Sequence, residues 1–97
     1  GDIFSPAFGV YAVRVTLEDG SAHNAVANYG MRPTVGGTAP QLEAHIFDFS
    51  GDLYGKLIDV AFIAYLRPEQ KFDGLDALKT QIARDSAKAR GILNRAK

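Results

Sequence analysis

Four stretches with the residue pattern of β-strands follow one another along the first two thirds of the chain. They are Gly9–Leu17, His23–Met31, Gln41–Phe49 and Lys56–Leu66. The first is rich in β-branched residues, and the polar turn Glu18–Ser21 behind it contains a glycine, as a hairpin requires. Strands joined by short turns pair with their neighbours, so the pattern predicts an antiparallel sheet that curls into a small barrel.

Proline and apolar runs set the expected limits of these strands. Pro33 cannot donate a ladder hydrogen bond, so we expect the second strand to stop at Arg32-Pro33-Thr34. The segment Val35–Pro40 is then expected to form a flexible loop. Nearly every position from Val60 to Leu66 is apolar, which predicts a last strand that is buried on both faces.

The pattern changes to a helical one near the C-terminus. Asp73 is the expected N-cap, and an apolar stripe with helical spacing follows it. The stripe consists of Leu75, Leu78, Ile82, Ala89 and Leu93. We therefore expect one domain, residues 1–97, of the mainly β class, in which a C-terminal helix packs on the barrel.

The third predicted strand carries the best candidate for chemistry. Leu42, Ala44 and Ile46 point to one face of it, and Glu43, His45 and Phe47 point to the other. A carboxylate and an imidazole two residues apart on a strand lie about 7 Å from each other. Glu43 could accept a proton there, although a solvated strand face explains the same pattern without any chemistry.

Composition excludes several classes of function. Eleven basic and eleven acidic residues give a formal net charge of zero, which argues against broad nucleic-acid binding. The chain has no cysteine, so it has no disulfide framework. No apolar run approaches the length of a membrane span, and we expect a cytoplasmic protein without a membrane partner.

Five segments, in order, resemble the riboflavin kinase family, specifically the C-terminal kinase module of the bacterial bifunctional enzyme that makes both flavin mononucleotide (FMN) and flavin adenine dinucleotide. They are Gly9–Val13, Ala27–Thr34, Leu42–Phe49, Asp52–Gly55 and Tyr65–Asp73. The resemblance implies a six-stranded Greek-key barrel with a C-terminal helix. It also implies transfer of the γ-phosphoryl group of ATP, with Mg²⁺, to the ribityl 5′-hydroxyl of riboflavin, and a partner FMN adenylyltransferase domain in a longer chain.

By motif position, the resemblance assigns roles to individual residues. Glu43 would be the general base, and Tyr54, His45 and Asp48 would lie on the nucleotide side. A loop that closes over the flavin would contribute three substrate-binding residues, namely Arg67, Glu69 and Phe72. For Tyr54 and Phe72, ordinary core packing explains an aromatic side chain about as well as ligand contact does.

One family motif does not occur in this sequence. Family members carry a Gly-Phe/Tyr-Pro-Thr-Ala-Asn motif ahead of the segment that matches Gly9, and its threonine and asparagine hold metal and phosphates. We therefore expect the 97 residues to lack the first strand or two, to be inactive alone, and to pair edge to edge as a homodimer. The alternative functions are a non-catalytic flavin- or nucleotide-binding barrel and an interaction barrel.

Overall fold

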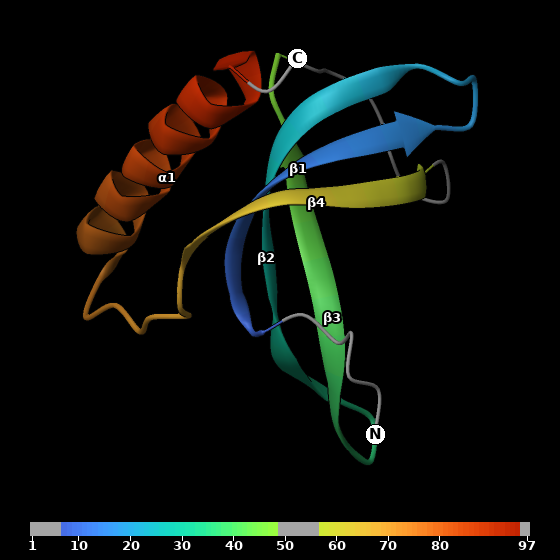
Figure 1. The fold of residues 1–97 in the computed structure, drawn as a ribbon. Coiled ribbons are helices and arrows are strands. Elements are labelled where there is room, and N and C mark those ends of the chain that lie inside the picture. The colour runs from blue at the N-terminus through green and yellow to red at the C-terminus, as the bar shows by residue number, and fades with distance from the viewer. Residues whose placement is uncertain (1–6, 49–56, 96–97) are drawn as a thin grey trace.

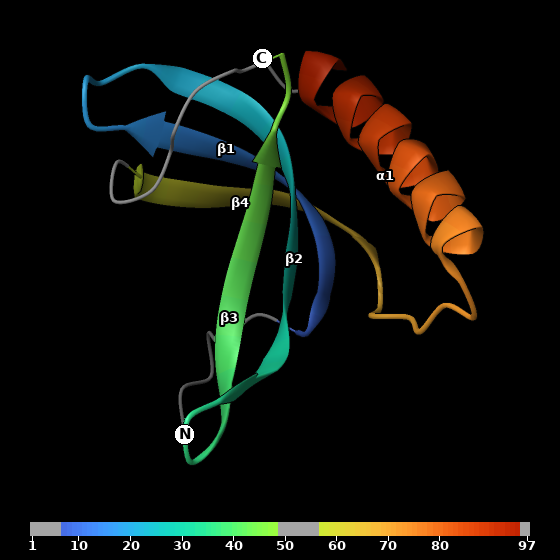
Figure 2. The same ribbon diagram turned by 180° about the vertical axis from the view of Figure 1, so that it is seen from behind.

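The computed structural model describes residues 7–48 and 57–95, which form one antiparallel sheet and one helix (Figure 1). The strands and the helix are β1 (Gly9–Leu17), β2 (Ala22–Thr34), β3 (Gly37–Ile46), β4 (Leu57–Arg67) and α1 (Leu75–Arg95). In both views α1 stands beside one face of the strongly twisted sheet, and a long connection leads to it from β4 (Figure 2).

The strand order is β3-β2-β1-β4. Three consecutive strands pair in sequence, and the fourth returns to lie beside the first, which is the order of a Greek key. All three pairings are antiparallel. This confirms the predicted class, a mainly β antiparallel Greek-key fold with a C-terminal helix. Four of the six strands that the family resemblance implies lie in the described part of the chain.

Strand β1 is the centre of the structure, because it has neighbours on both edges and is buried on both faces. Val10 and Ala12 face α1, where they pack with Ala89 and Leu93 of the helix. Val13 and Val15 face the opposite side, where Ala25 and Ile46 complete a second cluster. Alternate residues of β1 therefore belong to two separate cores, one under the helix and one on the other face of the sheet.

The β2–β3 hairpin is longer than the sequence predicted, and it projects beyond the other strands (Figures 1 and 2). The predicted strand end at Arg32-Pro33-Thr34 and the predicted loop Val35–Pro40 are wrong, because β2 and β3 stay paired to Thr34 and Gly37. The pairing of β2 with β1 ends at Tyr29, so Pro33 lies where β2 has a neighbour on one side only. A missing N–H on the open side costs no ladder hydrogen bond.

Two predictions of burial are wrong. In β4, Ala61, Phe62, Ile63 and Tyr65 are exposed, and Leu66 is the buried residue. In α1 only the C-terminal part of the apolar stripe, Ala89 and Leu93, is buried, whereas Leu75, Leu78 and Ile82 are exposed. Apolar spacing marks a face but does not show how far the neighbouring element reaches along it.

The described part of the chain contains no helix that is long and apolar enough to cross a membrane.

Candidate functional site

A cavity of about 470 Å³ lies between the sheet and the first half of α1. Its lining residues come from all four strands, the 68–74 loop and the helix: Val10, Val26, Ala27, Asn28, Glu43, Ala44, His45, Arg67, Gln70, Phe72, Leu78, Ile82 and Asp85. The exposed residues Leu78 and Ile82 of the apolar stripe therefore face a hollow instead of the sheet. The cavity has an apolar wall from the helix and the loop and a polar wall from β2 and β3.

Glu43 and His45 occupy the polar wall. Both lie on the face of β3 that the sequence predicted, and both side chains line the cavity. The side chain of Glu43 is 62% exposed, so it is open to solvent and to a bound ligand. Its cross-strand neighbour in β2 is Asn28. The structure thus brings the candidate proton acceptor to the rim of the cavity.

Asn28 is a site residue to which the sequence assigned no role. Its Oδ1 atom is buried and has no hydrogen-bond partner among the described residues. An unpaired buried polar atom costs about 1–3 kcal/mol, so this position is unfavourable for folding alone. Asn28 lies two residues from Val26 on the same face of β2, and these two residues pair with Glu43 and His45 of β3. The strand period of two could therefore have placed Asn28 at the site.

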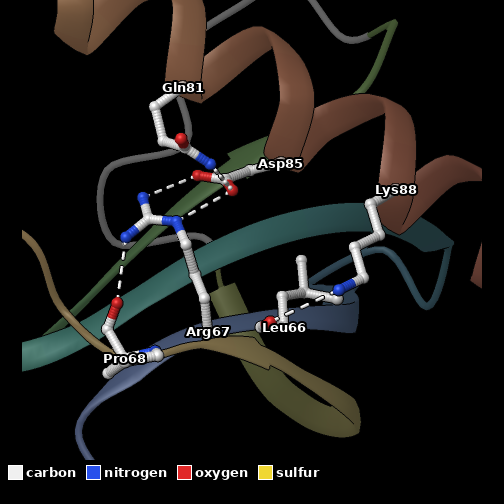
Figure 3. Close-up of polar contacts among 6 residues, drawn as sticks. All are labelled: Leu66, Arg67, Pro68, Gln81, Asp85 and Lys88. Atoms are coloured by element: carbon white, nitrogen blue, oxygen red, sulfur yellow. Dashed lines mark hydrogen bonds and ion pairs between the residues drawn. The ribbon is translucent and has the colours of Figure 1, made fainter.

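Arg67 and Asp85 join the end of β4 to the third turn of α1 (Figure 3). The Arg67 guanidinium donates two hydrogen bonds to the Asp85 carboxylate, from Nε to Oδ1 at 2.9 Å and from Nη2 to Oδ2 at 2.7 Å. Nη1 donates to the Pro68 carbonyl oxygen at 2.9 Å. The guanidinium lies 5.8 Å from the centre of the Phe72 ring. Arg67, predicted to bind substrate, therefore lines the cavity with its guanidinium already paired.

The electrostatics of Asp85 follow from these contacts. Burial raises the pKa of this carboxyl, but hydrogen bonds from Arg67 and Gln81 and the charges of Arg67 and Lys88 outweigh burial, so the pKa is lowered overall. Gln81 Nε2 donates to Oδ1 at 3.0 Å. Asp85 is thus a buried carboxylate held in its charged form, and it fixes one wall of the cavity.

Glu69 lies beside the cavity and is not one of its lining residues. Its Oε1 accepts a hydrogen bond from Arg32 Nη1 at 3.0 Å. The carboxylate also rests against Gly30, where a Cβ atom would come within 2.1 Å of Oε1. The same Arg32 approaches Glu43, with 3.8 Å between Nε and Oε1. Glu69, predicted to bind substrate, is therefore tied to β2 in this structure.

Comparison with known proteins identifies the family. The riboflavin kinase family model matches residues 1–93. The chain is 46% identical over 90 residues to the bifunctional riboflavin kinase/FMN adenylyltransferase of Haemophilus influenzae, covering 93% of this chain and 29% of that protein. It is 50% identical over 86 residues to the Escherichia coli K12 protein of the same name, covering 89% and 28%. The chain belongs to the riboflavin kinase family.

A solved structure supports the fold of this riboflavin kinase family member. A crystal structure described as a macrolide-efflux protein from Streptococcus pneumoniae superposes with a TM-score of 0.79 at 34% identity. The match covers 90% of this chain and 28% of that chain. The chain thus spans less than a third of the length of the curated relatives above and of this structural neighbour.

Two of the three residues assigned to the nucleotide side of a riboflavin kinase, His45 and Asp48, line different cavities in the described structure. His45 lines the large cavity with Glu43. Asp48 lines a separate polar cavity of about 280 Å³ near the end of α1, where Arg90 Nη1 donates to it at 3.0 Å. The hydrogen bond and the charge of Arg90 lower the pKa of Asp48. Tyr54 lies outside the described residues.

Riboflavin kinases use ATP with a divalent metal ion. Within residues 7–48 and 57–95, no group of three or more His, Cys, Asp or Glu side chains could hold a metal ion. Glu43 and Asp85 are therefore assigned no role as metal ligands.

Proposed function

We propose that this chain is the riboflavin kinase domain of a longer bifunctional protein and phosphorylates the ribityl 5′-hydroxyl of riboflavin with ATP. The chain belongs to the riboflavin kinase family, and its Glu43 lies on the rim of a cavity with one apolar wall. This position of Glu43 is the observation that carries the proposal. Phe72, Leu78 and Ile82 offer that wall to a flat aromatic ring system. The rim offers a carboxylate to a hydroxyl group.

The chemistry assigned to Glu43 is general base catalysis. Its carboxylate accepts the proton of the 5′-hydroxyl while that oxygen attacks the γ-phosphorus of ATP. The bond between the γ-phosphorus and the β,γ-bridging oxygen breaks, ADP leaves, and FMN carries the phosphoryl group. Catalysis of this kind depends on positioning, because the reacting oxygen must lie within about 3–3.5 Å of the atom that it attacks.

The remaining walls of the cavity have positioning roles in this proposal. Arg67 and Asp85 hold the start of the 68–74 loop against α1, and Phe72 of the same loop reaches the cavity. The loop is thus anchored at its β4 end, and in this structure Glu69 also holds it against β2. We propose that it closes over the flavin and excludes water from the reacting groups.

Two further elements of the proposal concern the longer protein. The names of the relatives support an FMN adenylyltransferase domain in the same chain. We propose that a part of the longer protein outside these 97 residues supplies the threonine and asparagine that hold Mg²⁺ and the phosphates. The need for ATP and the lack of cysteine are in keeping with the cytoplasm as the place of action.

The direct test is FMN formation. The domain, expressed with the segment that precedes it in its gene, is incubated with riboflavin, ATP and Mg²⁺, and the products are separated by chromatography. The proposal predicts one FMN and one ADP for each riboflavin consumed. Tight riboflavin binding without any FMN would instead support the alternative of a non-catalytic flavin-binding barrel.

A further inference from the structure

Arg32 stands between two carboxylates that come from different parts of the fold. Its Nη1 donates to Glu69 Oε1 at 3.0 Å, and its Nε lies 3.8 Å from Glu43 Oε1. Arg32 belongs to β2, Glu43 to β3, and Glu69 to the 68–74 loop. The guanidinium therefore contacts both the loop and the candidate base.

The loop side of this arrangement is fixed by backbone geometry. Glu69 rests so closely on Gly30 that a Cβ atom there would lie 2.1 Å from Oε1 and 2.3 Å from Cδ. Any residue other than glycine would displace the Glu69 side chain. On the other side, Arg32 Nη1 also donates to the Met31 carbonyl oxygen at 2.9 Å. When Glu69 is in place, the guanidinium is thus held at two points.

These contacts stabilise the fold only slightly. The side chains of Arg32, Glu69 and Glu43 are 27%, 34% and 62% exposed. Ion pairs with that exposure contribute about 0–1 kcal/mol. A small displacement of a reacting group has a larger effect, because a misplacement of about 1 Å can lower a rate by about 10²-fold. The effect of Arg32 is therefore expected on turnover more than on stability.

We propose that Arg32 is a positioning residue that transmits the position of Glu69, and hence of the 68–74 loop, to the Glu43 carboxylate. The inference rests on the proposed function, in which Glu43 is the general base. With the loop docked, Glu69 holds Arg32, and Arg32 holds Glu43 toward the cavity. When the loop leaves, Glu69 leaves with it, and Glu43 loses its orientation. The base is thus placed correctly only when the loop covers the substrate.

A phosphate-binding role for Arg32 is less favourable. One guanidinium with two carboxylates carries a net charge of −1, which repels a phosphate group. A phosphate-binding arginine would chiefly change the affinity for ATP. A positioning arginine changes turnover and leaves the affinities for ATP and riboflavin nearly unchanged, so kinetics distinguish the two roles.

The experiment compares Arg32→Gln, Arg32→Lys, Glu69→Gln and Gly30→Ala in the protein used for the FMN assay. The control is Lys79→Gln, which removes an exposed cation of α1 that lines neither the large cavity nor the smaller cavity beside the 68–74 loop. We expect Arg32→Gln, Glu69→Gln and Gly30→Ala each to lower kcat about tenfold, with KM for both substrates changed less than about twofold. Arg32→Lys, which keeps the charge, is expected to recover part of the loss.

The double variant Arg32→Gln/Glu69→Gln separates transmission from independent effects. If the two residues act in series, its kcat equals that of Arg32→Gln alone, whereas multiplied losses contradict the proposal. An unchanged kcat in Arg32→Gln, or a rise confined to KM for ATP, also overturns the proposal.

Thermal unfolding of each variant shows that the fold is retained, and Gly30→Ala repeats the test without touching any charge. An inactive wild-type protein would overturn the proposed function itself, which is a different result from an active enzyme that is insensitive to Arg32.

Discussion

Arg67 and Asp85 form a two-point ion pair, 18 residues apart in sequence, that fastens the end of β4 to α1. Their side chains are 19% and 9% exposed, so the pair is largely shielded from water. Loss of one partner leaves the other charge poorly solvated. The pair therefore holds the helix against the sheet along the half of α1 where apolar contacts are few.

The first prediction concerns stability. Asp85→Ala leaves the Arg67 guanidinium without its partner, and we expect the free energy of unfolding to fall by about 3 kcal/mol. Urea denaturation followed by circular dichroism measures the change. The control is Asp59→Asn, which alters an exposed carboxylate of β4 and should have almost no effect. Equal stability of the wild type and Asp85→Ala would show that the ion pair does not hold α1 in place.

The second prediction concerns pH. The pKa of Asp85 is lowered in the folded protein from an ordinary value of 3.8. The stability that the Asp85 carboxylate contributes is fully present at a pH above its ordinary pKa. It is lost as the pH falls through the lower pKa of the folded protein. The stability difference between the wild type and Asp85→Asn should thus be constant above about pH 5 and shrink below about pH 4. A difference that grows on acidification would contradict the lowered pKa.

The sequence was informative where a residue's neighbours are near in the chain, and less so where they are distant. The strand β1, the β1–β2 turn and the face of Glu43 all follow from alternation and glycine placement. The burial of β4 did not follow, because Phe62 and Tyr65 are apolar residues on an edge strand that the described chain leaves uncovered. The helix begins at Leu75, and the Gly74 carbonyl accepts the bond from Leu78 N–H, so the N-cap is Gly74 and not Asp73.

The site shows the same division. Four residues that motif position selected as site candidates line one cavity in the structure, namely Glu43, His45, Arg67 and Phe72. The pairing of Arg67 with Asp85 was not predictable, because it depends on how α1 lies against β4. The contact of Glu69 with Gly30 depends in the same way on the path of the 68–74 loop.

The third prediction concerns this loop. The 68–74 loop should exchange its amide hydrogens quickly without ligand and slowly with FMN and ADP bound, as a closing lid requires. Hydrogen exchange followed by mass spectrometry measures both states. The β1 segment, which is buried on both faces, is the internal control and should be protected in each. Equal exchange of the loop in the two states would count against closure.

The fourth prediction concerns the isolated 97-residue chain. Among the described residues β4 has a neighbour on one edge only, and Ile63 and Tyr65 are exposed on it. We expect concentration-dependent dimers through this edge, measured by sedimentation velocity. Ile63→Lys should shift the equilibrium to monomer, whereas Ala77→Lys, which adds the same charge on the exposed side of α1, should not. A wild-type chain that stays monomeric at all concentrations would contradict this prediction.

The central claim is that Glu43 is the general base of a riboflavin kinase, and Glu43→Gln tests it most directly. The amide keeps the shape of the side chain but cannot accept the proton. We expect kcat for FMN formation to fall by about 10²-fold or more, with an unchanged dissociation constant for riboflavin. Glu18→Gln, in the exposed β1–β2 turn, should retain wild-type kcat. Unchanged turnover of Glu43→Gln with weakened riboflavin binding would contradict the claim and make Glu43 a binding residue.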